Sequence, residues 1–391
     1  MPVIALRSPG LLTQAGLFVV FAISIASAEP YVPQDDHMVL ASVPVDAALV
    51  RLRAGQRRVD DGATDPSAAI ALAHEWLELG RRRADPRFDG YAEAALAAWR
   101  EEPNPPLELG LVRARLFERR HDFNSARAEL DRLIERRPGF GPALLARAAL
   151  WRIRGDAPVA LGDCRAAAND VGLYLATACV AETMGLGAAA ERARLMFERL
   201  VDQEQVVAAT QAHAVRLAAA ELAIRNGELN LAQRHLDAAR RIEPVDPYRA
   251  ALQADVWIAA GQHAKVLEAV SADAPLVLAL RRAISVKAMG GNELELNRRL
   301  RGWFESEQAR GEPIHSAERA LWRLDVEPDA ARALAAARLN WSEQKRPHDL
   351  WLLARAALAA GDADAVQAVR EWISDTGLID VRIAALLAKA P

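Results

Sequence analysis

Histidines and paired acidic residues are the side chains in this sequence that could take part in catalysis or bind a metal. His74 and Glu75 begin a segment in the manner of a zinc-protease helix, but the position one helical turn on holds Glu78 instead of a second imidazole. His121 and His263 fall in segments expected to be turns, where polar side chains are common. Paired carboxylates fall in polar connecting segments, and the sequence contains neither a nucleophile elbow nor a phosphate-binding glycine loop. We therefore expect no catalytic residues, no metal site, no cofactor and no enzymatic activity.

The bulk composition limits the classes of partner. Apolar residues make up 52% of the 391 residues and charged residues 26%, which is the composition of a folded chain. The formal net charge is −3, whereas nucleic-acid binding requires a basic surface. We expect no nucleic-acid partner.

The first residues have the pattern of an export signal. Arg7 precedes an apolar run from Leu17 to Ile25, and the small residues Ala26-Ser27-Ala28 follow. A run of about nine residues is too short to span a bilayer as a helix, although an uncleaved anchor is the alternative. The pattern predicts a signal peptide over residues 1–28, cleavage near Ala28, and a periplasmic or otherwise secreted protein. We expect no membrane span in the mature chain.

An internal repeat of 34 residues organises the rest of the chain. We number each 34-residue repeat from its first residue and call this numbering its frame and each position a place. In the frame that begins at Leu107, small residues occupy the eighth and twentieth places, and a turn occupies the fifteenth and sixteenth. Frames that begin at Gly141, His213 and Pro247 repeat the small residues. The small residues at these places are Ala114 and Ala126, Ala148 and Ala160, Ala220 and Ala232, and Ala254.

This pattern predicts stacked pairs of antiparallel helices. Small residues let two helices approach closely, and glycine at the fifteenth place ends the first helix because it accepts a left-handed backbone. Gly155, Gly227, Gly261 and Gly361 take that place, and weaker frames place Gly185, Ala335 and Leu339 in further hairpins. One hairpin cannot bury its apolar face alone, so several must stack into a superhelix.

The period and its small places resemble the tetratricopeptide repeat. The resemblance implies an all-α fold, a right-handed superhelical solenoid of antiparallel helix pairs. We expect about nine hairpins over residues 66–391, preceded at residues 29–65 by a leader and a capping helix near Ala47 to Val59. The stretches Tyr31–Leu40 and Asp85–Ala94 are similar to exported bacterial members of unestablished function.

The two cysteines fall on neighbouring helices of this arrangement. Cys164 takes the twenty-fourth place of one hairpin, and Cys179 lies on the first helix of the next. Exported proteins meet oxidising conditions, so the pair is a candidate disulfide, with two buried free thiols as the alternative. Two cysteines alone cannot complete a metal site.

The resemblance also implies which side chains would face a partner, because the first helix of each hairpin lines the concave groove. Its polar places, expected to be exposed, could hold an acidic peptide through arginine, or could form a solvated face of mixed charge. The lysine and asparagine that bind chaperone tails in some members are replaced, so that partner is not expected. The candidate groove residues are Arg115, Arg119, Arg152, Glu221, Arg225 and Asp255.

Two functions fit these features. The first is a non-enzymatic scaffold or adaptor of the bacterial cell envelope that binds a protein or peptide in its concave groove. The second is an accessory protein in envelope polysaccharide export or modification, which would need aromatic and acidic side chains in the groove. Four C-terminal tryptophans could supply such a surface, or could simply pack between helices: Trp303, Trp341, Trp351 and Trp372.

Overall fold

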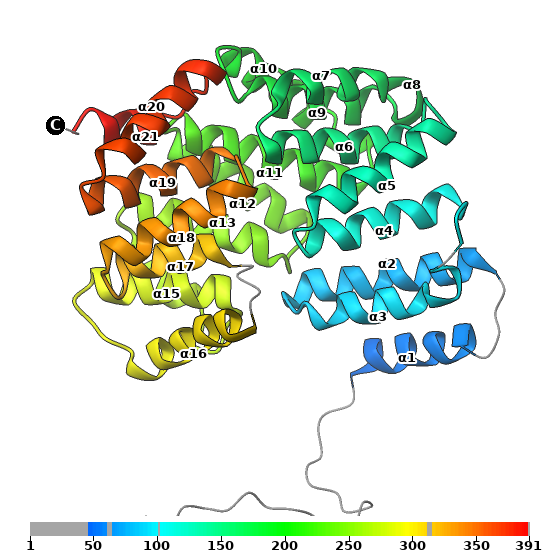
Figure 1. Ribbon diagram of the computed structural model, residues 1–391, viewed down its shortest axis with the longest axis horizontal. Coiled ribbons are helices and arrows are strands. Elements are labelled where there is room, and N and C mark those ends of the chain that lie inside the picture. Colours follow the sequence, from blue (N-terminus) through cyan, green and yellow to red (C-terminus); the bar gives the residue numbers. More distant parts are fainter. Residues whose placement is uncertain (1–45, 61–64, 101, 311–314, 390–391) are drawn as a thin grey trace, which may run out of the picture. The chain divides into compact units, whose positions relative to one another are not determined.

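The computed structural model describes residues 46–60, 65–100, 102–310 and 315–389, and all regular elements in these segments are helical (Figure 1). The predicted signal peptide, 1–28, and most of the predicted leader, 29–65, lie outside the described residues. The chain divides into residues 1–47 and a compact unit of residues 48–391, which carries the repeats. Within the described segments, no helix combines the length and hydropathy that a membrane crossing requires.

Nine antiparallel hairpins follow one another in the described residues, between the single helices α1 (Ala47–Asp60) and α21 (Val381–Leu387). Three short segments lie in the connections: η1 (Ala97–Trp99), α8 (Ala168–Val171) and η2 (Glu204–Val206). The hairpins are α2 (Pro66–Arg83) with α3 (Arg87–Ala95), α4 (Leu107–Arg119) with α5 (Phe123–Arg136), α6 (Gly141–Arg154) with α7 (Ala157–Ala166), α9 (Leu173–Met184) with α10 (Ala190–Val201), α11 (Ala209–Arg225) with α12 (Leu229–Ile242), α13 (Pro247–Ala259) with α14 (His263–Ala269), α15 (Leu276–Ala288) with α16 (Leu294–Arg310), α17 (Ser316–Asp325) with α18 (Ala330–Glu343), and α19 (Pro347–Ala360) with α20 (Ala363–Thr376). The chain is thus an all-α solenoid of stacked antiparallel helix pairs.

The turn inside a hairpin is built by two consecutive residues. Gly155 and Gly361 have φ angles of 84° and 65°, in the left-handed region that glycine adopts without strain. The aspartate that follows caps the second helix, since the Asp156 carboxylate accepts a hydrogen bond from the Val159 amide at 3.2 Å. The left-handed glycine predicted at this place is confirmed here, but Gly185 is different: its φ is −65°, and an inserted turn separates α9 from α10.

Alanines at the contact places allow the close approach of the helices. Ala148, Ala220 and Ala254, at the eighth place, have no exposed surface. In α18 the register predicted from Ala335 and Leu339 is wrong, because Leu339 is 43% exposed and the buried alanines lie two residues earlier. The reason is that α17 has only 10 residues, so the second helix starts sooner than a full repeat would place it.

The first hairpin contacts the middle of the solenoid through an arginine. Arg81, at the end of α2, forms ion pairs with Glu243 and, at 3.4 Å, with Asp246, which lie in the connection between α12 and α13. Asp246 is buried and also contacts His213 of α11 at 2.7 Å. We call this set of residues the N-terminal clasp. It joins segments more than a hundred residues apart in sequence.

The connections between the last helices contact earlier hairpins. The Lys345 amide donates a hydrogen bond to the Ile153 carbonyl at 2.6 Å, and the Ile379 amide donates one to the Leu186 carbonyl at 3.0 Å. Gly155 packs against the indole of Trp372. We call these contacts the C-terminal seam. Together with the N-terminal clasp, the seam closes the superhelix on itself.

Candidate functional site

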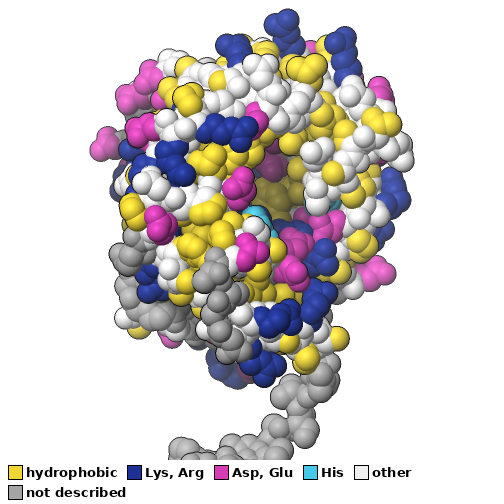
Figure 2. Space-filling view, turned by 90° about the vertical axis from the view of Figure 1, so that its right-hand side faces the viewer, with side chains coloured by type: hydrophobic (Ala, Val, Ile, Leu, Met, Phe, Trp, Pro, Cys, Tyr) yellow, Lys and Arg dark blue, Asp and Glu magenta, His cyan; other side chains and the backbone are white. Residues whose placement is uncertain are grey.

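The first helices of the hairpins surround a hollow, whose mouth Figure 2 shows among hydrophobic, acidic, basic and histidine side chains. A pocket of about 240 Å³ lies on the first helices α2, α4 and α6. Glu118 of this pocket is influenced electrostatically by Arg346, which precedes α19, so the C-terminal hairpin faces α4. The principal lining residues of the pocket are His74, Leu111, Arg115, Glu118, Pro142 and Ala146.

Arg115 and Glu118 lie one turn apart on α4 and both contribute to this pocket. Burial, followed by the charge of Arg119, lowers the pKa of Arg115. Burial also raises the pKa of Glu118, against the opposing effect of Arg115. Arg115 keeps an exposed surface and Glu118 is half-buried, so the protein removes part of the water from each charged group without fully compensating its charge.

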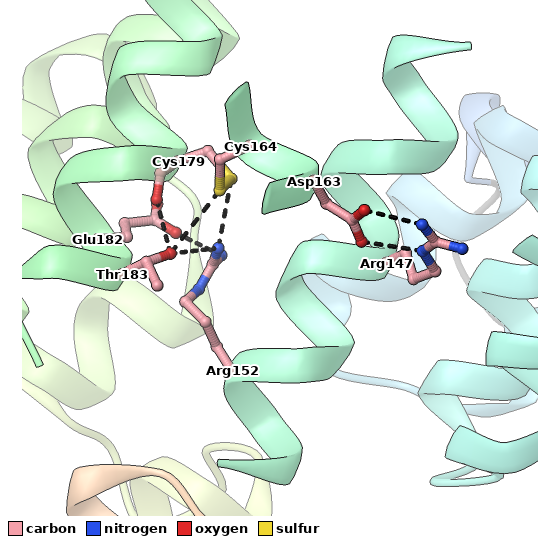
Figure 3. Close-up of a disulfide and its surroundings, with 7 residues drawn as sticks. All are labelled: Arg147, Arg152, Asp163, Cys164, Cys179, Glu182 and Thr183. Atoms are coloured by element: carbon pink, nitrogen blue, oxygen red, sulfur yellow. Dashed lines mark hydrogen bonds and ion pairs between the residues drawn. A yellow bond between two sulfur atoms is a disulfide. The ribbon is translucent and has the colours of Figure 1, made fainter. Parts of the chain in front are cut away.

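Arg152, on α6 of the next hairpin, points toward the disulfide (Figure 3). Its guanidinium pairs with Glu182 at 2.5 Å and lies 3.5 Å from the hydroxyl of Thr183 and from the sulfur of Cys179. Burial raises the pKa of Glu182. The wall of the hollow is here formed by an ion pair between α6 and α9.

The structure joins Cys164 of α7 and Cys179 of α9 in a disulfide (Figure 3). Beside it, Arg147 binds the Asp163 carboxylate with two hydrogen bonds of 2.9 and 2.8 Å. The covalent bond and the ion pair hold neighbouring helices together behind the wall of the hollow.

Glu221 and Tyr248 form the next part of the wall, on α11 and α13. The Tyr248 hydroxyl donates a hydrogen bond to the Glu221 carboxylate at 2.6 Å. Tyr248 exposes 49% of its surface, yet burial and then Glu221 raise the pKa of its hydroxyl well above the usual value. Arg346 and Glu182, from other parts of the wall, also influence this hydroxyl, so its exposed surface faces the hollow.

Three candidate groove residues are engaged by neighbouring hairpins. Asp255 accepts two hydrogen bonds of 2.9 Å from Arg281, and Arg119 pairs with Asp89 at 2.7 Å. Arg225 is only 8% exposed and donates to the Gly185 carbonyl at 2.9 Å, so its expected exposure is wrong. The inserted turn after α9 covers Arg225, which the 34-residue frame alone could not reveal.

Sequence reasoning missed Glu182, Tyr248 and Arg346. Glu182 is at the twelfth position of its repeat, as Glu118 and Arg152 are in theirs. The 34-residue repeat alone could therefore have predicted that Glu182 faces the hollow. Arg346 pairs with Asp349 at 3.1 Å and faces the hollow only because the superhelix closes. A local repeat pattern carries no information about that closure.

The C-terminal tryptophans serve mainly in packing. Trp341 and Trp372 meet edge to face with ring centroids 5.1 Å apart, and the Lys345 ammonium lies 4.4 Å from the Trp341 ring. Trp351 packs against His348, with the Arg355 guanidinium 4.8 Å from its ring. Trp303 is different, because it is 39% exposed and its indole N–H donates a hydrogen bond to Glu307 at 3.2 Å. The other three pack against neighbouring helices, so the four do not form one row of open aromatic faces as a sugar-binding groove would.

No cluster of three metal-binding side chains occurs within the described part of the chain. No protein-family model matches the sequence, and no curated protein matches it.

Several solved structures are similar to this chain. A tetratricopeptide repeat protein from Parabacteroides merdae is 18% identical, with a TM-score of 0.37, over 73% of this chain and 98% of that one. Cut9, in a complex with Hcn1, is 11% identical, with a TM-score of 0.40, over 87% of this chain and 86% of its own. Yeast Tom70 is 10% identical, with a TM-score of 0.26, over 88% of each chain.

Proposed function

We propose that this tetratricopeptide-type solenoid is a non-enzymatic scaffold that binds an extended segment of a protein or peptide in its hollow, in the bacterial cell envelope. The observation that carries the proposal is the wall itself, to which first helices of successive hairpins contribute charged, aromatic and apolar side chains. Such a wall offers many weak contacts along one path, which is how an extended polypeptide is recognised.

The charge pattern of the wall favours a polypeptide over a strongly charged polymer. Most of its ionic groups are already paired, as in Arg152 with Glu182 and Arg281 with Asp255. A wall of fixed, mutually paired charges has little net attraction for a polyanion, but its paired groups can still exchange hydrogen bonds with a peptide backbone. Leu111, Pro142 and Ala146 add apolar surface for side chains.

Two features support a site of action outside the cytoplasm. The pattern of residues 1–28 is that of a signal peptide. The only two cysteines of the chain form a disulfide, a bond that persists chiefly in oxidising compartments. Periplasmic or secreted localisation therefore belongs to the proposal.

Site-specific photo-crosslinking in cells of the native host tests the proposal. A photoreactive phenylalanine replaces Tyr248, whose side chain lies in the hollow, and in a control strain it replaces Val206, which is 83% exposed on η2. We expect a discrete polypeptide adduct at position 248, attached through one segment of the partner, and none of the same mass at 206. Identical adducts at both positions, or none at 248, would refute binding in the hollow.

A further inference from the structure

The pocket beside α4 differs from the rest of the wall in its ionic groups. Elsewhere in the hollow, Arg152, Arg281 and Arg346 each pair with a carboxylate. Arg115 and Glu118 form no ion pair or hydrogen bond through their side chains, with each other or with any other described residue. One unpaired cation and one unpaired anion thus share a single pocket.

We propose that this pocket binds a zwitterion, namely a free amino acid or a dipeptide, with its carboxylate at Arg115 and its ammonium at Glu118. The inference goes beyond the proposed peptide-binding function, because the ligand of this pocket is a small molecule with both charges and not a segment of a partner protein. It assigns a ligand that carries both a carboxylate and an ammonium group to one pocket of the hollow.

The energetic reason is the desolvation of the two side chains. Burial lowers the pKa of Arg115 and raises that of Glu118, although Arg115 keeps an exposed surface, so each charge is partly desolvated in the pocket. A ligand carboxylate and ammonium would supply the missing opposite charges through charge-assisted hydrogen bonds, which are the strong ones. A ligand of one sign would satisfy one side chain and repel the other.

The remaining lining fixes the size and polarity of the ligand. Leu111, Pro142 and Ala146 form an apolar surface next to the charged pair, suited to an aliphatic side chain. The volume of about 240 Å³ matches that of one or two amino-acid residues. Burial and then Arg115 lower the pKa of His74, so this imidazole is neutral near pH 7 and adds no second cation.

Calorimetric titration of the full protein with three probes tests the assignment. The probes are L-leucine, leucyl-leucine, and N-acetyl-leucine amide, which has the same side chain and neither charge. We expect one of the two zwitterions to bind and the capped compound to bind at least about tenfold more weakly. Preference between leucine and leucyl-leucine distinguishes the two sources of the zwitterion.

Variants locate the binding in this pocket. Arg115→Gln and Glu118→Gln should each weaken zwitterion binding about tenfold, and Arg115→Lys should retain most of it. Arg192→Gln, on the exposed face of α10, is the matched control and should bind as the unmodified protein does. Thermal melting first establishes that each variant is folded.

The outcomes separate this inference from the proposed function. If neither zwitterion binds, or if the capped compound binds equally well, the assignment is wrong. Tyr248 lies outside the pocket. A peptide crosslink at position 248 together with a failure of zwitterion binding would therefore contradict this inference and leave the scaffold function intact. If no crosslink forms at position 248 and neither zwitterion binds, both proposals are wrong.

Discussion

At the scale of single residues, His235 is a buried histidine held in its neutral form. It lies on α12, is 7% exposed, and its Nδ1 lies 3.2 Å from a guanidinium nitrogen of Arg216. Burial, then Arg216 and Arg234, lower its pKa to about 4, although Glu204 acts in the opposite direction. Protonation of the folded protein is therefore disfavoured.

This histidine makes stability depend on pH. The unfolded chain binds a proton near the ordinary pKa of about 6.5, whereas the folded chain does so only near 4. The stabilisation is therefore present above about pH 6.5 and is lost as the pH falls from there towards 4, by up to about 1.4 kcal/mol per pH unit. In urea titrations from pH 6.5 to 5, His235→Gln should show a shallower decline than the unmodified protein; an equal decline would contradict this account.

At the scale of elements, the disulfide between α7 and α9 joins two neighbouring hairpins. The bridged residues are 15 apart in sequence. Closing a loop of that size restricts the unfolded chain and is associated with roughly 3 kcal/mol in the entropic model. The bond also crosses the position where α8 interrupts the regular repeat.

Removing the disulfide should destabilise the protein without unwinding its helices. For the double variant Cys164→Ala and Cys179→Ala, we expect the free energy of unfolding to fall by roughly 3 kcal/mol, with an unchanged helical circular dichroism signal at 20–25 °C. Denaturant titration measures the difference. Adding dithiothreitol to the unmodified protein should reproduce it but should leave the double variant unchanged; sensitivity of the variant to the reductant would point to another cause.

The sequence could predict the local hairpins because their determinants are local. The alanines that allow close helix contact, the left-handed Gly155 and the capping Asp156 all act within one repeat. The register of α18 could not be predicted, since it depends on how early α17 ends. The side chains that face the hollow were only partly predictable: Arg115 follows from its place in the frame, whereas Arg225 is covered by the turn inserted after α9.

At the scale of the whole repeat unit, closure depends on contacts between residues far apart in sequence. Lys345 meets Ile153, and Arg154 donates a hydrogen bond of 3.2 Å to the Glu343 carbonyl. Neither contact has a counterpart in the 34-residue period, so the sequence pattern predicts the concave groove but carries no information about its closure.

Two glycine variants separate the C-terminal seam from backbone strain. Gly155 and Gly261 have φ angles of 84° and 69° at the same place of their repeats. A Cβ at Gly155 would lie 2.6 Å from the Trp372 ring, whereas a Cβ at Gly261 would meet nothing within 4 Å. Gly261→Ala should therefore lower the free energy of unfolding by about 1 kcal/mol, through the strain of the left-handed backbone alone. Gly155→Ala should lower it by more, because the added Cβ also meets the Trp372 ring.

Hydrogen exchange shows which part of the structure the additional destabilisation by Gly155→Ala affects. In Gly155→Ala, the Lys345 amide, which donates to the Ile153 carbonyl, should exchange faster than in the unmodified protein. In Gly261→Ala its exchange should be unchanged. Equal exchange in the two variants would mean that the packing of Gly155 against Trp372 does not hold the seam closed.

The closed wall has a topological consequence for any linear ligand that enters the hollow. With the N-terminal clasp and the C-terminal seam both formed, the wall is joined at these contacts, and a bound segment would have to leave through the mouth of the hollow, along its own length. The residence time of the segment then depends on what lies at its ends, because a folded domain or bulky group at an end would block this movement. A partner threaded in this way would stay attached through geometry, even where each individual contact with the wall is weak.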